Sequence, residues 1–247
     1  MRLNRFYTER INIREGSSVK LPDSDNAHIR KVLRLKKGDE IIVFNGEKEF
    51  LGELTLVSID AVMVKLKKLL KEEDFSIDAK VEITLFQGLL RAGKFDDILE
   101  KTTELGIDYI VPIECEFSQS KVINAQGKIE RWNKILIAAS KQSERVRLPD
   151  LIEPMTFRES VEHLKEFDIV YFFTTSKKEK IKQLPKKIDK SVRKVAYFIG
   201  PEGGFSPKEH KLAKENSLEF YSIGKTVLRS ETASIVVAGL LEFLYNS

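Results

Sequence analysis

The sequence has few of the residues and patterns that several classes of protein require. Its 247 residues include one cysteine, Cys115, so no disulfide can form within the chain, which fits a reducing compartment. Three scattered histidines and that cysteine cannot form a plausible zinc site. No apolar run approaches the roughly 18 residues that a membrane span needs, and the N-terminus has no apolar signal region. These absences predict a cytoplasmic protein without a metal site or a membrane span.

Complete motifs for nucleotide phosphates are absent as well. Gly224-Lys225-Thr226 resembles the end of a phosphate-binding P-loop, but Glu219 stands where that motif begins with glycine. No Gly-x-Gly-x-x-Gly follows a predicted strand, which argues against a dinucleotide site or a conventional Rossmann methyltransferase site. No Gly-x-Ser-x-Gly elbow of a hydrolase is present either.

Positive charge is concentrated in the first third of the chain. Residues 1–72 contain 15 Lys and Arg against 11 Asp and Glu, which accounts for the whole net charge of +4. The remaining residues are balanced. This asymmetry predicts an N-terminal part that meets a polyanion, with chance and a solvated lysine face as the alternative.

Short strands and turns dominate the first 70 or so residues. An Asn45-Gly46 pair between two of the strands indicates a tight turn. The pattern predicts a small barrel followed by a charged linker at residues 67–78. The predicted strands are 3–7, 40–44, 50–58 and 62–66, and the predicted helix is 24–35, with Asp23 or Ser24 as its cap.

The rest of the chain alternates strands with helices, and its strands are almost continuously apolar. This pattern is typical of a buried parallel sheet with helices on both faces, so we predict an α/β fold for this part. The predicted strands are 81–87, 109–113, 168–174, 195–199 and 220–223, and the predicted helices are 95–105, 129–142 and 231–244.

A glycine-rich loop joins one of these strands to a helix. Gly200, Gly203 and Gly204 follow the strand 195–199, and the segment 206–209 has the sequence of a capping box with proline at the first helical position. Open α/β sheets bind ligands where a strand ends and a helix begins, and glycine lets backbone approach the ligand. The alternative is a tight turn that needs positive φ.

Polar residues gather in a second strand-to-helix loop. The apolar helix 231–244 begins among them. A cation, two hydroxyls and a carboxylate are brought to the sheet edge there by Arg229, Ser230, Glu231 and Thr232. Capping of that helix by Ser230, with Glu231 favoured by the helix dipole, explains two of the four. Arg229 and Thr232 remain as candidates for chemistry.

The two loops together closely resemble the signature of a known family. IGPEGGFSPKE (199–209) and IGKTVLRSETAS (223–234) are similar to segments of the bacterial rRNA uridine-N3 methyltransferases, the RsmE family of the SPOUT superfamily. The resemblance extends to residues 1–7, 28–34, 101–106 and 137–149. The glycine-rich loop alone occurs in related rRNA and tRNA methylases, and its combination with LRSETA and the N-terminal block is far more specific.

The resemblance implies a fold in two parts and a dimer. Residues 73–247 would form a SPOUT methyltransferase domain, an α/β domain with a parallel sheet whose last segment makes a deep trefoil knot. Residues 1–72 would form a PUA-like β-barrel that grips RNA. Family members act as homodimers, with the active site at the subunit interface.

The resemblance also implies S-adenosyl-L-methionine as the cofactor, bent in the knot and cradled mainly by the backbone of three loops. The residues expected to hold it are Phe173, Thr174, Thr175, Ile199, Gly200, Pro201, Glu202, Gly203, Gly204, Ile223, Gly224, Val227, Leu228, Arg229, Ser230 and Thr232.

The implied reaction is methylation of ring nitrogen 3 of a specific uridine in 16S rRNA, within the small ribosomal subunit. This nitrogen lies on the Watson–Crick edge, so the base must be unpaired or flipped out. Arg229 would stabilise the uridine anion, and Glu231 or Glu202 would accept the imide proton. Glu202 could instead orient the glycine-rich loop or contact the cofactor.

RNA contacts are expected from basic residues of the N-terminal domain and of the sheet edge. Such phosphate contacts give affinity without sequence readout. The expected residues are Arg2, Arg5, Arg30, Arg34, Lys36, Lys37, Arg91, Lys94, Arg145 and Arg147.

Two other functions compete with this one. The first is a catalytically silent RNA-binding factor for ribosome assembly, and the intact loop at residues 200–204 argues against it. The second is a SPOUT methylase that acts on another RNA position, such as tRNA or a ribose hydroxyl, and the N-terminal block argues against that.

Overall fold

The computed structural model describes residues 3–9, 12–73, 80–91, 93–119, 121, 125–176, 179–185, 189 and 191–246. The chain divides into two compact units, Met1–Phe75 with Ser140–Leu148, and Ser76–Ala139 with Pro149–Ser247. Our predicted boundary between residues 72 and 73 stays a prediction. Nothing in the sequence pattern indicates that residues 140–148 belong to the first unit.

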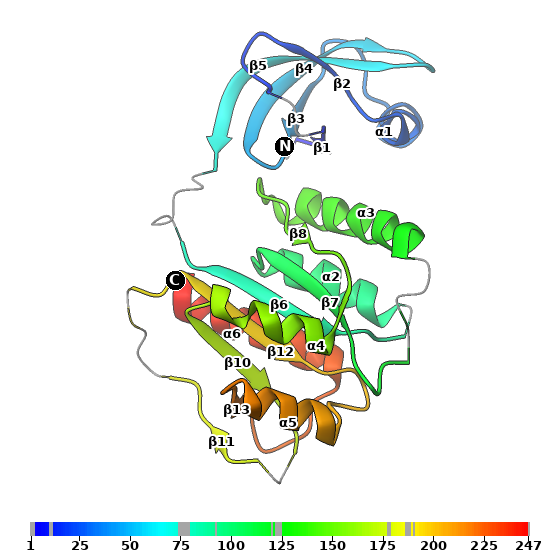
Figure 1. The fold of residues 1–247 in the computed structure, drawn as a ribbon. Coiled ribbons are helices and arrows are strands. Elements are labelled where there is room, and N and C mark those ends of the chain that lie inside the picture. Colours follow the sequence, from blue (N-terminus) through cyan, green and yellow to red (C-terminus); the bar gives the residue numbers. More distant parts are fainter. Residues whose placement is uncertain are drawn as a thin grey trace. The chain divides into compact units, whose positions relative to one another are not determined.

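In the first unit, the described residues form a five-stranded sheet in the order β1-β3-β4-β5-β2, drawn in blue to cyan in Figure 1. β1 pairs with β3 in parallel, and the other neighbours are antiparallel. Alternate side chains of the strands fill the core, among them Val43, Leu54 and Val64. The elements are β1 (Arg5–Tyr7), β2 (Ser18–Lys20), α1 (Asp23–Ala27), the π-helical turn η1 (His28–Val32), β3 (Glu40–Phe44), β4 (Lys48–Val57) and β5 (Val62–Glu72).

The predicted turn at Asn45-Gly46 is confirmed. It joins β3 to β4, which pair from Phe44 opposite Glu49 onward. The Asn45 carboxamide oxygen accepts hydrogen bonds from the backbone N–H groups of Glu47 and Lys48, at 3.0 and 2.8 Å. This side chain therefore closes the turn, which is the local role that makes asparagine common in turns.

Two predictions for this unit need correction. β5 continues to Glu72, so the linker predicted from Lys67 begins too early. Its charged residues belong to a strand that pairs with β4, and Lys48 lies opposite Glu72 with an ion pair of 2.8 Å. The predicted helix 24–35 is present as α1 and η1, but its N-cap is Pro22, without a side-chain hydrogen bond.

The described residues of the second unit form an eight-stranded sheet in which every pair is parallel, which confirms the predicted fold class. The order is β11-β13-β10-β12-β6-β7-β8, with β9 beside β7. The strands are β6 (Glu82–Gly88), β7 (Tyr109–Glu114), β8 (Asp150–Leu151), β9 (Met155–Thr156), β10 (Ile169–Phe173), β11 (Ile181–Lys182), β12 (Lys194–Ile199) and β13 (Glu219–Tyr221).

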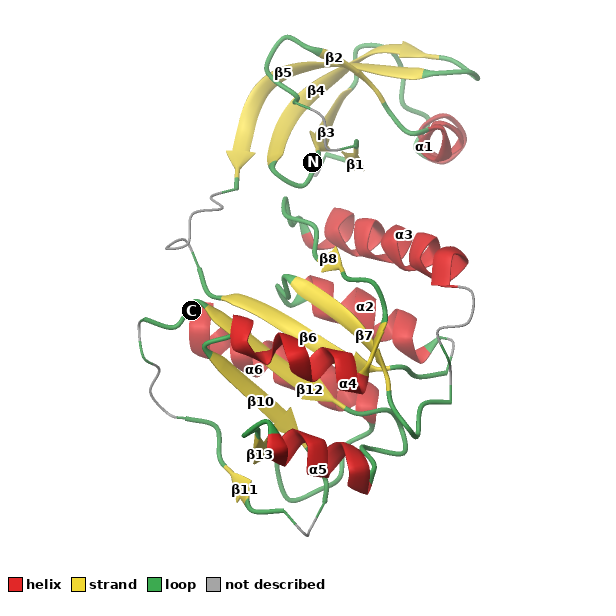
Figure 2. Ribbon diagram, viewed as in Figure 1, coloured by secondary structure: helices red, strands yellow, loops and turns green. Residues whose placement is uncertain are grey.

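Helices cover both faces of this sheet (Figure 2). Val195, Tyr197 and Ile199 of β12 face the cluster that includes α2 and α6, whereas Ala196 and Phe198 face the cluster that includes α4 and α5. This alternation explains the unbroken apolar strands, because both faces are buried. The helices are α2 (Lys94–Glu104), α3 (Ala125–Ser143), α4 (Phe157–Ser160), the 3₁₀ turn η2 (Val161–Glu166), α5 (Pro207–Glu215) and α6 (Ser230–Asn246).

The final helix α6 lies in the core of the second unit, where Val237, Ala238 and Leu241 are completely buried. The trefoil knot implied for this segment stays a prediction. In the described part of the chain, no helix has both the length and the apolar character needed to cross a membrane.

Candidate functional site

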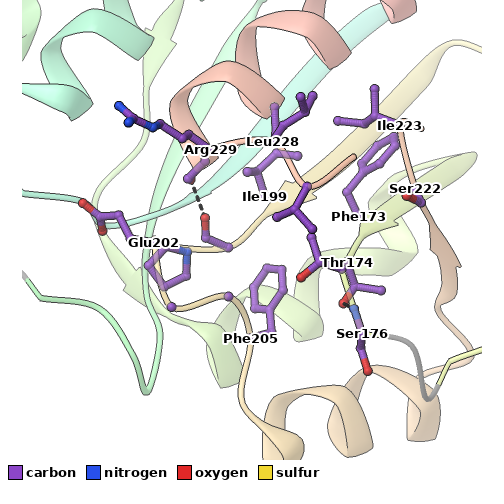
Figure 3. Close-up of a pocket in the computed structure, with 18 of the residues that line it drawn as sticks. Phe173, Thr174, Ser176, Ile199, Glu202, Phe205, Ser222, Ile223, Leu228 and Arg229 are labelled. Atoms are coloured by element: carbon purple, nitrogen blue, oxygen red, sulfur yellow. Dashed lines mark hydrogen bonds between the residues drawn. The ribbon is translucent and has the colours of Figure 1, made fainter. Parts of the chain in front are cut away.

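A pocket of about 790 Å³ lies in the second unit at the carboxyl ends of three neighbouring strands, β13, β10 and β12. Its walls are the loops that follow these strands, together with one side of α5, the first turn of α6 and the first residue of α2. Figure 3 shows Arg229 and Glu202 at one end, and Phe173, Ser222 and Ile223 at the other. This edge of the sheet is where open α/β folds bind ligands.

The structure brings together most of the residues that the sequence predicts for a cofactor. The lining includes Phe173, Thr174, Thr175, Ile199, Gly200, Pro201, Glu202, Gly203, Gly204, Ile223, Val227, Leu228, Arg229 and Ser230, and also Glu231. Gly224 and Thr232 do not line the pocket, although both lie within two residues of lining positions.

Further lining residues were not predicted, and they come mostly from α5 and from the strand ends. Lys94, expected to contact RNA, lies in the pocket too. Those of α5 follow the glycine-rich loop at helical spacing, which is the signal in the sequence that could have found them. The additional residues are Ser176, Glu179, Phe205, Pro207, His210, Lys211, Lys214, Ser222, Thr226 and Ala233.

The glycine-rich loop is shaped partly by the protein itself. Gly204 has φ +70°, which favours glycine, and its N–H donates to the carbonyl of Pro201 at 2.8 Å. A Cβ on Gly203 would come within 2.9 Å of the Cβ of Phe117, a side chain that is 43% exposed. The turn alternative is therefore realised at Gly204, and close contact with Phe117 explains Gly203.

The predicted capping box at the start of α5 is confirmed. The Ser206 hydroxyl accepts from the N–H of Glu209 at 3.3 Å, and the Glu209 carboxylate accepts from the N–H of Ser206 at 2.7 Å. The other oxygen of Glu209 accepts from the N–H of Glu116 at 2.8 Å. One buried carboxylate thus ends the glycine-rich loop and holds the loop that carries Phe117.

Ser230 connects the two predicted loops. Its hydroxyl donates to the carbonyl of Gly200 at 2.5 Å and accepts from the Gln87 carboxamide at 3.2 Å. The hydroxyl of Ser234, one turn further along α6, donates to the carboxamide oxygen of Gln87. Ser230 is the first residue of α6 and not its cap, because the first helical hydrogen bond is accepted by the carbonyl of Arg229.

His210 is held firmly at the α5 wall of the pocket. Its Nδ1 lies 2.9 Å from the carbonyl of Ser206, which fixes Nδ1 as the donor. Its Nε2 lies 2.8 Å from the hydroxyl of Thr174, which also accepts from the N–H of Ser176 at 3.1 Å. The network orders the end of β10 next to the pocket.

Charged side chains gather at the Arg229 end. The Lys94 ammonium lies 3.5 Å from a carboxylate oxygen of Glu202 and 3.4 Å from one of Glu231. The second oxygen of Glu231 is buried and has no hydrogen-bond partner among the described residues. The Arg229 guanidinium likewise makes no hydrogen bond or ion pair within the described ranges, and the residue is exposed. An unsatisfied buried acceptor beside a free cation is what a site for a polar ligand offers.

Part of the pocket wall is apolar. It is lined by Phe173, Ile199, Phe205, Ile223 and Leu228, and Figure 3 shows Leu228 and Ile199 next to Arg229 with Phe173 and Ile223 further from it. Such a wall suits a flat aromatic base, whereas the carboxylates suit a positively charged group. The pocket can therefore hold a ligand that carries both.

The residues predicted to contact RNA fall into three groups. Arg2 lies outside the described residues. Arg147 and the side chain of Arg5 are buried. The Arg5 guanidinium pairs with Glu49, donates to the carbonyl of Arg145 at 2.8 Å and lies over Phe44. The others are at least partly exposed, namely Arg30, Arg34, Lys36, Lys37, Arg91, Lys94 and Arg145.

The sequence profile of the RNA methyltransferase domain matches residues 78–242, and that of the RNA methyltransferase PUA domain matches residues 21–66. These are the sheet with its pocket and the five-stranded unit. The fold and the site thus define the class, an RNA methyltransferase with an N-terminal PUA domain.

Relatives narrow the class. A ribosomal RNA small subunit methyltransferase E of Rickettsia conorii is 30% identical, covering 99% of this chain and 97% of the relative. A methyltransferase of Legionella pneumophila solved with bound cofactor SAM is 28% identical with a TM-score of 0.86, covering 98% of both chains. A ribosomal RNA small subunit methyltransferase E of Neisseria gonorrhoeae bound to S-adenosyl methionine is 25% identical with a TM-score of 0.84, covering 99% of both. The chain belongs to the ribosomal RNA small subunit methyltransferase E family.

Proposed function

We propose that the protein methylates ring nitrogen 3 of a uridine in 16S ribosomal RNA, with S-adenosyl-L-methionine as methyl donor. The observation that carries this proposal is the pocket, which joins a glycine-rich loop at the sheet edge to two carboxylates and a free arginine. Two relatives of the same fold hold this cofactor, and the relatives that are ribosomal RNA small subunit methyltransferases E supply the substrate class.

The residues of the pocket fit the cofactor. The apolar wall of Phe173, Ile199 and Leu228 would hold the adenine ring, and the backbone of residues 199–204 and 223–230 would hold its polar groups. The buried, unpartnered oxygen of Glu231 offers an acceptor for a donor group. When bound, the cofactor supplies an activated methyl group on a positively charged sulfur, which neighbouring carboxylates favour.

Methylation of ring nitrogen 3 first requires loss of its imide proton. We assign the proton to the carboxylate of Glu231 or of Glu202, both within reach of the same ammonium. The electron pair left on nitrogen forms the N–CH₃ bond, and the pair of the breaking S–CH₃ bond stays on sulfur. The exposed Arg229 guanidinium would stabilise the uridine anion before transfer. The remaining requirement is that the flipped base is held with its nitrogen in line with the methyl group.

RNA binding is assigned to the first unit. Arg34, Lys36 and Lys37 are exposed there, and the matched PUA profile describes a domain of RNA methyltransferases. Guanidinium and ammonium groups on this unit would hold phosphates without reading bases. Arg147 and the side chain of Arg5, which are buried, would serve the structure of the unit instead.

A homodimer completes the proposal. Val236, Leu240 and Phe243 recur at helical spacing on α6 and are exposed, Phe243 by 71%. An apolar stripe on one helix of an otherwise charged surface suits contact with a second copy. Sedimentation at increasing protein concentration tests it, with Phe243→Glu expected to give monomers.

The function is tested with small ribosomal subunits that lack the modification. The protein is incubated with these subunits and S-adenosyl-L-methionine, and the modified nucleoside is mapped by mass spectrometry. We expect one methyl group on nitrogen 3 of one uridine. A methyl group on a ribose, or on tRNA alone, would overturn the substrate. Absence of cofactor binding by calorimetry would favour a silent assembly factor.

A further inference from the structure

We infer that Lys94 is a positioning residue of the active site: its ammonium holds the carboxylates of Glu202 and Glu231 side by side, in the place from which one of them accepts the proton. The inference rests on the proposed function. It also replaces the contact with RNA phosphate that the sequence suggests for this lysine.

The first support is geometric. Lys94 lines the pocket, and its Nζ lies almost equally far from the two carboxylates, at 3.5 Å and 3.4 Å. Its side chain is 36% exposed, while those of Glu202 and Glu231 are 21% and 18% exposed. Both distances are within ion-pair range but longer than a tight charge-assisted hydrogen bond. The ammonium therefore bridges the two carboxylates and is bonded tightly to neither of them.

The second support is the place of Lys94 in its helix. It is the first residue of α2, where the helix dipole disfavours a cation by about 0.3–1 kcal/mol. Asp96 and Asp97 follow in the first turn, as the dipole favours. The N-cap, Gly93, has φ +93°, and a Cβ there would meet nothing within 4 Å, so only its backbone conformation requires glycine. A residue that breaks a local rule beside a pocket points to a function there.

The third support is what remains open at the site. Lys94 approaches one oxygen of Glu231, and the other oxygen is buried without a partner among the described residues. The ammonium thus holds one oxygen of Glu231 in place and leaves the other to accept a proton. Two other cations do not replace the Lys94 ammonium. Arg131 pairs with Asp96, and Arg229 makes no ion pair within the described ranges.

Loss of the ammonium should affect the chemical step more than binding. Two carboxylates without the shared cation would repel each other, and one would turn away from the position in which it accepts the proton. The kcat should then fall while the KM for RNA stays nearly constant. A lysine that only held a phosphate would show the opposite split.

The experiment compares kcat and KM on methylation-deficient small subunits for the wild type, Lys94→Met, Lys94→Arg, Glu231→Gln and Lys94→Met/Glu231→Gln. Lys101→Met is the matched control, because Lys101 lies on the same helix outside the pocket lining. We expect Lys94→Met to lower kcat by about 10- to 100-fold, with KM within about 2-fold. Lys94→Arg should restore most of the rate, and Lys101→Met should behave as wild type.

The double variant tests whether Lys94 acts through the carboxylate. In the Glu231→Gln background, Lys94→Met should cost less than about 3-fold, because only one charged carboxylate remains and the repulsion that Lys94 offsets is already gone. Independent, multiplying effects of the two substitutions would overturn the inference, and so would an unchanged kcat with a raised KM for RNA. Thermal unfolding shows whether Lys94→Met folds. If it does not fold, Lys94→Arg takes its place, and a rate of Lys94→Arg far below that of the wild type would contradict the inference. A wild type that binds cofactor but methylates no small subunit would instead sink the proposed function.

Discussion

Arg229 stands where the loop after β13 enters α6, and its carbonyl accepts the first helical hydrogen bond from Ala233 at 2.8 Å. Its side chain is free at the pocket, so its substitution should leave the loop in place. We predict that Arg229→Ala binds S-adenosyl-L-methionine as well as wild type but loses about 100-fold in kcat, since one charge that stabilises the uridine anion is gone. Calorimetry and single-turnover kinetics measure the two effects separately.

Arg229→Lys is the control for this prediction. It keeps the charge but loses the planar fork, so an intermediate rate is expected. Undiminished turnover in Arg229→Ala would show that the anion is stabilised elsewhere. A loss of cofactor affinity equal to the loss of rate would assign Arg229 to binding.

For single residues, the sequence predicts which loops line the pocket better than it predicts where the charged side chains lie. Residues 199–204 and 226–231 line one pocket because each loop is a local motif at the end of a strand. Lys94 comes from a helix distant in sequence, and its place beside Glu202 follows from tertiary packing, which no local pattern contains. Arg5 shows the converse, since an arginine expected on the surface is buried against Glu49.

The helix α5 ends the glycine-rich loop through its capping box, and α4 has the same box at Thr156 and Glu159, which does not line the pocket. We predict that Ser206→Ala and Thr156→Ala each lower the free energy of unfolding by about 1 kcal/mol, because each removes one cap. Only Ser206→Ala should weaken cofactor binding, since only its cap ends that loop. Urea unfolding and calorimetry measure both effects, and equal cofactor affinity of the two variants would contradict the prediction.

Strands β10 and β12 begin side by side, and a carboxylate joins their first residues. The backbone N–H groups of Arg193 and Lys194 donate to Asp168 at 2.8 and 2.9 Å, which holds the pKa of that carboxyl below its usual range. A carboxyl with a lowered pKa stabilises the fold above its unfolded pKa, about 3.9, and this contribution is lost as pH falls through the folded pKa.

Asp168→Asn should therefore lower the Tm by about 2 °C at pH 7 and by less near pH 3, because part of the contribution of the carboxylate is lost once the pH is below its unfolded pKa. Differential scanning calorimetry at both pH values measures it. The same Tm difference at both would show that the charge of Asp168 contributes nothing. The group is exposed, so a small effect is expected.

The elements themselves followed from the sequence wherever burial sets a clear period. β6, β10 and β12 are buried on both faces and read as apolar runs. The strand predicted at residues 62–66 ends too early. The residues that follow in β5, such as Lys67 and Lys68, are exposed and charged, and only pairing with β4 shows that they belong to the strand. The two-residue strands β8, β9 and β11 are set by their neighbours and have no signal of their own.

The division of the whole molecule shows a further limit of sequence patterns. Apolar periods predict that a helix exists at residues 129–142, and α3 confirms it. They do not predict which unit holds each end of the helix, because residues 140–148 join the first unit through contacts far apart in sequence, such as Lys141 with Asp25 at 3.0 Å. Assignment to a unit depends on partners and not on period.

The charge excess of the first unit makes a prediction for the whole molecule in contact with RNA. Each phosphate contact releases counterions, so the logarithm of affinity should fall linearly with the logarithm of salt concentration, with a slope near −0.7 to −0.9 for each contact. Arg34, Lys36 and Lys37 are exposed. Their combined replacement by alanine should make the slope about 2 units shallower without changing kcat at saturating RNA.

Arg5→Ala is the contrasting variant. The Arg5 guanidinium is buried against Glu49, so its loss should lower the free energy of unfolding by about 3 kcal/mol while the slope stays the same. Filter binding at several salt concentrations, with urea unfolding of both variants, distinguishes the two roles, and an unchanged slope in the triple variant would place the RNA surface elsewhere.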